Sequence, residues 1–384
     1  MYAYSFLDDF VLLYPVYTLL FGDTGLSVWK ISSLFVIWSV SSMAFEVPSG
    51  ALADATSRRG LLITGPLLTA VAFALWVTFP GYWMFALGFL LWGLKTALTS
   101  GALEALVYDE LAQIGATGKY SALMGRGKVA GVLAAMLAGV VASPLLSVGG
   151  FVAVGAASAG LSLLSAVIAT LFPENRIRLP GEDIEPGWTS ALAAGVAEAR
   201  RSRRIRSAVL LVAAVASVWG ALDEYTPLLL ASTGATDSDV ALLMVVVWAG
   251  AAAGGLLAGR ASRIGTLRLG LLICCGSVLL AAGALAGHPS GVVAVAAAFG
   301  IFQLATVVAD TRLQDSISGP ARATVTSLAG MSTDVATLMV YGSYAALAQT
   351  GGHGGAFAVL ALPYLAVSVI LATNGWRRAA NRDR

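Results

Sequence analysis

Long apolar runs alternate with short polar breaks along the whole chain. A bilayer core about 30 Å thick requires about 20 mostly apolar residues per helix. Runs of that length predict twelve membrane-spanning helices, at roughly 4–21, 28–53, 61–79, 82–108, 121–143, 150–172, 207–231, 239–258, 267–286, 291–313, 321–347 and 355–374. The breaks contain turn-forming residues, as in FGDTG, FPGYW, STGATDSD, GHPSG and QTGGHGG. The pattern therefore predicts an all-α membrane protein.

The longest polar interval divides the predicted helices into two sets of six. We expect an N-terminal six-helix bundle over 1–172, a cytoplasmic central loop over 173–206, and a C-terminal six-helix bundle with a short cytoplasmic tail over 207–384. The second part of the loop, 188–206, is either an amphipathic helix on the membrane surface or a linker with no function of its own.

Positive charges indicate which ends of the helices face the cytoplasm. With the N-terminus placed inside, 21 of the 23 lysines and arginines fall on one side of the membrane, and only Lys30 and Lys95 do not. Cytoplasmic loops carry an excess of such residues, so we expect both termini to be cytoplasmic. The first apolar run lacks the features of a cleaved signal peptide, so it is expected to remain as a helix. We therefore predict a multi-pass protein that is located in the bacterial inner (plasma) membrane.

Composition supports this class and excludes others. Hydrophobic residues make up 58% of the chain, charged residues 11%, and mean hydropathy is +0.83. A net charge of +2 gives no reason to expect nucleic-acid binding. The two cysteines, Cys274 and Cys275, are adjacent, and no HExxH, CxxC or GxSxG pattern occurs. We therefore expect neither an enzyme nor a metal site, and no cofactor.

Two short segments of the chain repeat one another. GALADATSRRG at 50–60 aligns with GLLAGRASRIG at 255–265, an offset of 205 residues. Asp109 and Asp310 lie at the inner ends of the fourth and tenth predicted helices, at nearly the same offset. Parallel repeats of six helices are an architecture of secondary transporters.

The segment 50–60 resembles the loop signature between the second and third helices of the major facilitator superfamily. Gly50, Asp54, Arg58 and Arg59 match that signature, whereas alanine and serine replace a basic residue and a glycine at 55 and 57. The preceding FEVPSG resembles drug-efflux branches of the family. The resemblance implies twelve helices in two pseudo-symmetric bundles, a small-molecule substrate, transport driven by a proton gradient, and a monomer.

The same loop suggests a gate on the cytoplasmic side. We expect Asp54 to face the start of the eleventh helix near 319–322, where the helix dipole is positive, and Arg58 to reach Asp109. The alternative is that the arginines only fix the topology. The candidate gating residues are Glu46, Gly50, Asp54, Arg58, Arg59, Glu104 and Asp109.

Ionisable residues inside the predicted helices are candidates for coupling. A charge at the centre of a membrane helix costs about 2.5–3.5 kcal/mol on insertion scales, so such residues are usually functional. The candidates are Asp8, Asp9, Lys95, Asp223, Glu224 and Asp334. Helices 1, 4, 7 and 10 line the cavity in the family, so we favour a pair between Lys95 and Asp9 (or Asp8). The alternative to a coupling role is that these side chains lie in the inner headgroup region, reach the outer water, or form pairs that only stabilise the structure.

Aromatic residues on the candidate cavity helices are possible substrate contacts. They are Tyr14, Tyr17, Trp92, Trp219, Tyr225 and Phe302, with Gln303 beside them. Contact with lipid or with neighbouring helices is the alternative. Small residues four apart, at Gly250 and Gly254 and at Gly255 and Gly259, predict close helix packing. The stretch AGVVASPLLSVGG at 138–150 only partly resembles the antiporter motif, which leaves the direction of exchange open.

Together these features predict a transporter that works by alternating access. Proton-coupled export of a small organic compound, such as a drug or secondary metabolite, is the favoured function. Proton-coupled uptake of a metabolite is the alternative within transport, and a non-transporting membrane receptor is the alternative outside it.

Overall fold

The computed structural model is helical over the residues that it describes. These are residues 1–384 except 56, 175–201, 262–263, 318–321 and 381–384. The side chains of 47–55, 322–323 and 374–380 are also outside the described part. The chain divides into two compact units: Met1–Asp183 with Asp237–Leu242, and Ile184–Thr236 with Leu243–Arg384. Each unit is described by itself below.

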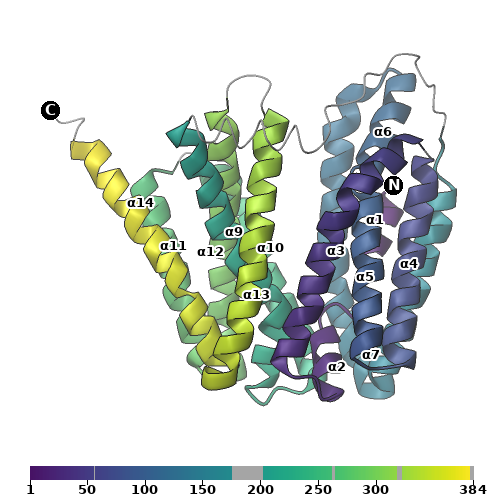
Figure 1. The fold of residues 1–384 in the computed structure, drawn as a ribbon, viewed down its shortest axis with the longest axis horizontal. Helices are drawn as coiled ribbons and strands as arrows, with labels where there is room; N and C mark the ends of the chain where they lie inside the picture. Colours follow the sequence, from purple (N-terminus) through teal and green to yellow (C-terminus); the bar gives the residue numbers. More distant parts are fainter. Residues whose placement is uncertain (56, 175–201, 262–263, 318–321, 381–384) are drawn as a thin grey trace. The chain divides into compact units, whose positions relative to one another are not determined.

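The first unit is a bundle in which α4 is central. Its helices are α1 (Tyr2–Asp9), α2 (Tyr17–Asp23), α3 (Val28–Ala55), α4 (Arg58–Thr78), α5 (Tyr82–Thr99), α6 (Ala102–Gln113), the short η1 (Thr117–Lys119) and α7 (Tyr120–Thr170). α4 packs against both α5 and α7, α3 packs against α5, and α1 packs against α7 (Figure 1). The short α1 therefore lies against the long α7 and near α4 and α5.

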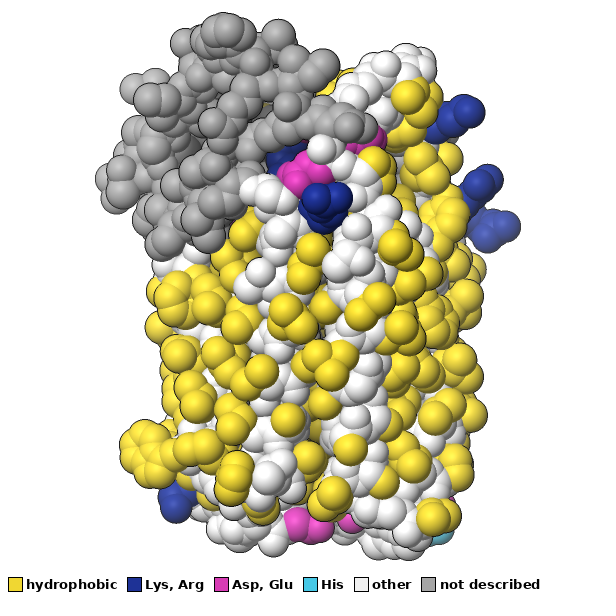
Figure 2. All heavy atoms as spheres, turned by 90° about the vertical axis from the view of Figure 1, so that its right-hand side faces the viewer, with side chains coloured by type: hydrophobic (Ala, Val, Ile, Leu, Met, Phe, Trp, Pro, Cys, Tyr) yellow, Lys and Arg dark blue, Asp and Glu magenta, His cyan; other side chains and the backbone are white. Residues whose placement is uncertain are grey.

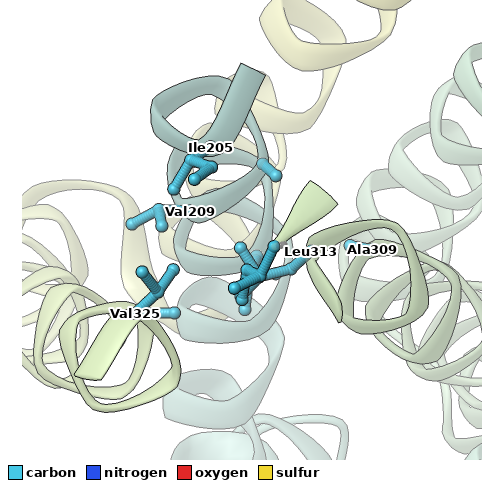
Figure 3. Packing of buried hydrophobic residues seen from close by; sticks show 9 residues of the cluster. Ile205, Val209, Ala309, Leu313 and Val325 are labelled. Carbon is cyan, nitrogen blue, oxygen red and sulfur yellow. The ribbon is translucent and has the colours of Figure 1, made fainter. Parts of the chain in front are cut away.

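The second unit is built on the same plan from the rest of the chain. Its helices are α9 (Arg203–Ala231), most of α10 (Asp237–Ala261, whose first residues Asp237–Leu242 belong to the first unit), α11 (Thr266–Leu285), the short η2 (Pro289–Gly291), α12 (Val292–Ser316), α13 (Arg322–Leu360) and α14 (Leu362–Ala380). α9 packs against α12 and α13, and α11 packs against α12 and α14. Figure 3 shows apolar side chains from three of these helices pointing toward one another, among them Ile205, Val209, Leu313 and Val325.

Nine segments of the described chain are long and apolar enough to cross a membrane. Two of them, Thr117–Thr170 and Thr324–Thr373, have 54 and 50 residues. At 1.5 Å per residue such a helix would be about 75–80 Å long, far more than the bilayer core. Each is interrupted by a glycine with non-helical backbone angles, Gly150 (φ 60°) and Gly352 (φ 65°). Each segment therefore divides at that glycine, as the predicted breaks at 144–150 and QTGGHGG require, and the second segment also has a turn at Ala361 between α13 and α14.

The first predicted helix is broken, which the sequence analysis did not anticipate. We expected one helix over 4–21, but α1 ends at Asp9 and α2 begins at Tyr17. Pro15 explains the break, because proline lacks a backbone N–H and clashes with the preceding turn of a helix. The backbone N–H of Leu13 instead donates to Ser158 Oγ of α7, at 3.0 Å. The fourth predicted helix is likewise interrupted, at Gly101 (φ 69°) between α5 and α6.

The surface agrees with a protein that lies in a membrane. Figure 2 shows one face on which apolar side chains cover the middle, while lysine, arginine, aspartate and glutamate lie toward the two ends. Large hydrophobic side chains on the outside include Val71, Leu137, Leu271 and Met339, with exposed fractions of 43–62%. A soluble protein rarely exposes such a continuous apolar area.

Candidate functional site

An ion pair lies inside the first unit between α1 and α5. Lys95 Nζ is 2.8 Å from Asp8 Oδ2, and the two side chains are only 13% and 24% exposed. Gly65 of α4 makes room for α5, since a Cβ there would lie 2.6 Å from Thr99 Cγ2 and 3.2 Å from Lys95 Cγ. The structure thus confirms a pair between Lys95 and an acid of the first helix, and the acid is Asp8.

Asp9 is the second carboxylate of this site. Its side chain packs against α7 at Gly131, where an added Cβ would lie 2.0 Å from Asp9 Oδ2. It is also close enough to Asp8 and Lys95 to interact electrostatically with both. The sequence analysis did not identify Gly131, although only glycine leaves space for this carboxylate. The site therefore contains two acids and one amine.

The end of α1 adds further negative potential at the same place. Asp8 and Asp9 are the last two residues of that helix, and the carbonyl groups at a helix C-terminus carry a partial negative charge. Lys95 is thus held by one direct carboxylate, a second carboxylate nearby and the helix end. Discontinuous helices that end inside the bundle are a common way for transporters to build binding sites. Chemically, the acids can hold a proton or a cation that competes with the lysine.

Tyr4 fixes the position of α1 within the bundle. Its ring is 2% exposed, its hydroxyl donates to the carbonyl of Leu62 on α4 at 3.3 Å, and the ring lies 5.5 Å from that of Phe172. Because Asp8 is one helical turn beyond Tyr4, this anchor sets where the carboxylate points.

A second cluster of polar contacts surrounds the start of α4. Ser57 caps the helix by accepting from the N–H of Gly60 at 2.9 Å. Arg58 forms an ion pair with Asp109 of α6, as the sequence analysis predicted. Arg59 donates from its side chain to the carbonyl of Phe172 at 3.2 Å. The start of α4 is thus tied to α6 and to the residues after α7.

Glu174 completes this cluster and was missed by the sequence analysis. It accepts hydrogen bonds from Ser57 Oγ and, at 3.4 Å, from the backbone N–H of Arg59. Its position in the interval we assigned to a linker gave no signal of this role. The surroundings of Gly50 and the side chain of Asp54 lie outside the described part, as do residues 319–321 and the side chain of Arg322 in the segment expected to meet Asp54. Glu46 on α3 and Glu104 in the first turn of α6 are both exposed.

The remaining candidate acids lie in the second unit. Asp223 of α9 accepts from the indole N–H of Trp248 on α10, at 3.1 and 3.4 Å to its two oxygens. Glu224 is buried, with 7% of its surface exposed. Asp334 lies on the exposed side of α13. The structure places Asp223 and Glu224 side by side on α9, and Asp334 on a different helix.

Several candidate cavity aromatics are packing residues instead. Tyr225 and Phe302 are fully buried, stacked on Tyr344 and Tyr364 at centroid distances of 3.7 and 3.9 Å. Tyr17 is 2% exposed within a cluster of rings in the first unit. In the conformation described, these three side chains pack within their own units.

The other members of that set keep some exposed surface. Trp219 donates from its indole N–H to Thr306 Oγ1 at 3.2 Å, and Gln303 lies near Gly255 of α10. Tyr14 and Trp92 contact one another edge to face at 6.3 Å. All four are partly exposed.

No metal site is found among the described residues, where no three side chains of histidine, cysteine, aspartate or glutamate come together. The charged groups at the first-unit site are two carboxylates and an ammonium group.

Comparisons with known proteins place this arrangement in context. The model of one family, described as Major Facilitator Superfamily, matches residues 1–290. A search of curated proteins found no match. Among solved structures, a variant of the nucleoside transporter NupG is 15% identical, with 98% of each chain covered and a TM-score of 0.77. A bacterial homologue of the human lysosomal transporter Spinster is 15% identical, with 97% of this chain and 93% of that chain covered and a TM-score of 0.71.

A third similar structure is a D-xylose–proton symporter. It is 16% identical, with 96% of this chain and 94% of that chain covered and a TM-score of 0.68. At such low identity these likenesses establish the fold alone.

Proposed function

Because the chain belongs to the Major Facilitator Superfamily, and is thus a multi-pass membrane transporter of a small molecule and not an enzyme, we propose that it exports a small organic compound in exchange for protons. The observation that carries this proposal is the half-enclosed Asp8–Lys95 pair with Asp9 beside it. Asp8 and Lys95 are charged groups largely inside a membrane bundle, and such groups are costly and usually retained for transport, while Asp9 beside them is exposed.

The proposed mechanism is competition at these acids. When a proton neutralises one carboxylate, the negative potential that holds Lys95 falls and the site rearranges. When a substrate takes the place of the proton, the carboxylate is charged again and the proton leaves. Alternating access then requires that the site open to one side of the membrane at a time. In this proposal the protein acts as a monomer in the inner membrane, with both termini in the cytoplasm.

Transport assays on membrane vesicles test the function and its direction. The protein is first expressed in a strain that lacks its own efflux pumps. The compounds to which it then confers resistance are the candidate substrates. Everted vesicles given an inside-acid proton gradient are then expected to accumulate that compound. Uptake by intact cells without accumulation in vesicles would reverse the direction to import. Binding without flux in either preparation would indicate a receptor.

The cluster at the start of α4 supports a gating role on the cytoplasmic side. Arg58 pairs with a carboxylate of α6, whereas Arg59 contacts a backbone carbonyl. In the proposal, the cytoplasmic end is held closed by Gly50, Asp54 and the Arg58–Asp109 pair. Arg58 and Asp109 separate and bind other partners when that end opens.

Matched arginine variants separate gating from topology. Arg58→Gln and Arg59→Gln each remove one positive charge from the first turn of α4, so their effects on topology are equal. Only Arg58→Gln breaks an ion pair, and we expect it to slow export roughly tenfold while Arg59→Gln, which loses a hydrogen bond to a backbone carbonyl, slows it less than about twofold. Initial rates in everted vesicles measure this at equal expression. Equal slowing by both variants would leave the loop with a topological role only.

A further inference from the structure

The chain segment that follows α1 is held by a hydroxyl group of another helix. In a continuous helix the backbone N–H of Leu13 would donate to the carbonyl of Asp9, but here it donates to Ser158 Oγ of α7 at 3.0 Å. Leu13 is fully buried, and Ser158 is 1% exposed. The carbonyl of Leu13 accepts from the N–H groups of Val16 and Tyr17, at 2.9 and 2.7 Å. Leu13 therefore joins the start of α2 to α7.

The Asp8–Lys95 pair lies between two anchored points of the chain. Before it, the hydroxyl of Tyr4 is bound to a carbonyl of α4. After it, the chain leaves the helical path at Phe10, where ψ is 59°. Regular helical bonding stops there and resumes at α2, so the contact of Leu13 with α7 sets the direction in which α1 ends. The position of the Asp8 carboxylate depends on that direction.

The second unit contains the same arrangement at the corresponding place. The backbone N–H of Trp219 on α9 donates to the hydroxyl of Tyr364 on α14, at 2.9 Å. Trp219 lies 206 residues after Leu13. Tyr364 likewise lies 206 residues after Ser158, close to the offset of 205 between the repeated loop sequences. In each unit, a hydroxyl from the last predicted helix thus accepts a backbone N–H of the first predicted helix.

The two hydroxyl groups differ in where they donate. Ser158 Oγ donates to the carbonyl of Val154 within α7 at 2.8 Å, whereas the hydroxyl of Tyr364 donates to the carbonyl of Val215 on α9 at 2.9 Å. A hydroxyl whose proton is already used presents its lone pairs as acceptors. Since the proton of Ser158 is held within its own helix, this residue offers a fixed acceptor to the segment after α1.

We propose that Ser158 is a positioning residue for the Asp8–Lys95 pair. Its hydroxyl holds the broken end of the first helix so that the Asp8 carboxylate meets the ammonium group of Lys95. The inference deepens the proposed transport function and rests on it for its biological meaning. The alternative is that the hydroxyl only satisfies a buried N–H, which any N–H inside a membrane requires. Only a positioning residue changes the state of Lys95.

Chemical labelling of lysines in the purified full-length protein tests this role without substrate or a proton gradient. The probe is acetic anhydride, and mass spectrometry gives the rate of acetylation at each lysine. Lys30 is the internal reference, because its side chain is exposed. An amine held by a carboxylate reacts more slowly than a free one, so we expect Ser158→Ala to raise the rate at Lys95 relative to Lys30 about fivefold. Ser158→Thr, which keeps a hydroxyl, should label as the wild type does.

A matched variant controls for the loss of a buried hydroxyl. Ser162 lies one turn further along α7, and its hydroxyl donates to the carbonyl of Ser158 in the same helix at 3.0 Å. Ser162→Ala should therefore leave the labelling of Lys95 unchanged. Should Ser158→Ala be too unstable to purify, Ser158→Cys replaces it, because sulfur is a weak acceptor.

A double variant shows whether Ser158 acts through Asp8. Asp8→Asn removes the partner of Lys95 and should raise its labelling at least as much as Ser158→Ala does. Adding Ser158→Ala to Asp8→Asn should then raise it no further. Unchanged labelling in Ser158→Ala, an equal rise in Ser158→Thr or Ser162→Ala, or a further rise in the double variant would overturn the positioning role. Failure of proton-driven flux would overturn the proposed function alone, since the labelling uses no gradient.

Discussion

Lys95→Gln is expected to destabilise the protein more than Asp8→Asn, although each removes one end of the same ion pair. Without the lysine, the partly enclosed Asp8 is left beside Asp9, which is exposed, and beside the negative end of α1. Without Asp8, the lysine keeps Asp9 and the helix end as compensation. Breaking a buried pair costs about 3–5 kcal/mol. Since both groups retain some exposure, we expect about 3 kcal/mol for Lys95→Gln and about 1 kcal/mol for Asp8→Asn.

Thermal unfolding of the purified protein in detergent measures this asymmetry. The double variant Asp8→Asn/Lys95→Gln should recover part of the stability that Lys95→Gln loses, since no second carboxylate then opposes Asp9. Lys30→Gln is the matched control, because Lys30 is the other cation outside the cytoplasmic set and its side chain is exposed. Equal losses for the two single variants would contradict a role of Asp9 in holding the lysine.

Gly254→Ala is expected to destabilise the second unit, although alanine favours helices. A Cβ at Gly254 would lie 1.9 Å from the carbonyl oxygen of Gly300 on α12, and one at Gly250 would lie 2.2 Å from that of Ala296. The clash is with backbone, so no side chain can move aside and the helices must separate. Overpacking of this kind costs about 1–3 kcal/mol, against a gain of about 1 kcal/mol in helix propensity.

A second glycine in the same unit gives the control for this change. A Cβ added at Gly330 of α13 meets nothing within 4 Å, so Gly330→Ala should be neutral or stabilising. Fluorescence-detected gel filtration after a heating series compares the two variants. Similar behaviour of both would show that α10 and α12 do not rely on glycine for their contact.

Much of the architecture follows from apolar periodicity and small residues. The long runs required membrane helices, and glycine spacing at Gly250 and Gly254 correctly indicated close packing. Lys95 stood out because it is a cation that the topology cannot place in the cytoplasm, and the structure gives it a carboxylate partner. Arg58 and Asp109 were paired from their expected depths at the same membrane face. These predictions have the same basis, because the depth of a residue in the membrane follows from its position along an apolar run.

What the sequence leaves open is the direction in which each side chain points. Tyr225 and Phe302 were assigned to the cavity from their helices, but rotation of those helices turns them inward. Nothing in the sequence distinguishes Gly131 and Ser158 from other small residues. Their contacts with Asp9 and Leu13 appear only when the N-terminal segment is placed against α7. Pro15 was a readable signal for the broken first helix, because proline interrupts helical hydrogen bonding. Glu174 depends on where the chain turns after α7, which apolar periodicity does not encode.

Proton movement in everted vesicles tests the central claim most directly. The vesicles are loaded with acid, and a pH-sensitive dye reports the interior while the identified substrate is added outside. The account predicts that substrate raises the interior pH in the wild type and in Lys30→Gln, and that Asp9→Asn and Lys95→Ala abolish this response. Substrate accumulation without proton release in the wild type, or an undiminished response in both site variants, would contradict it.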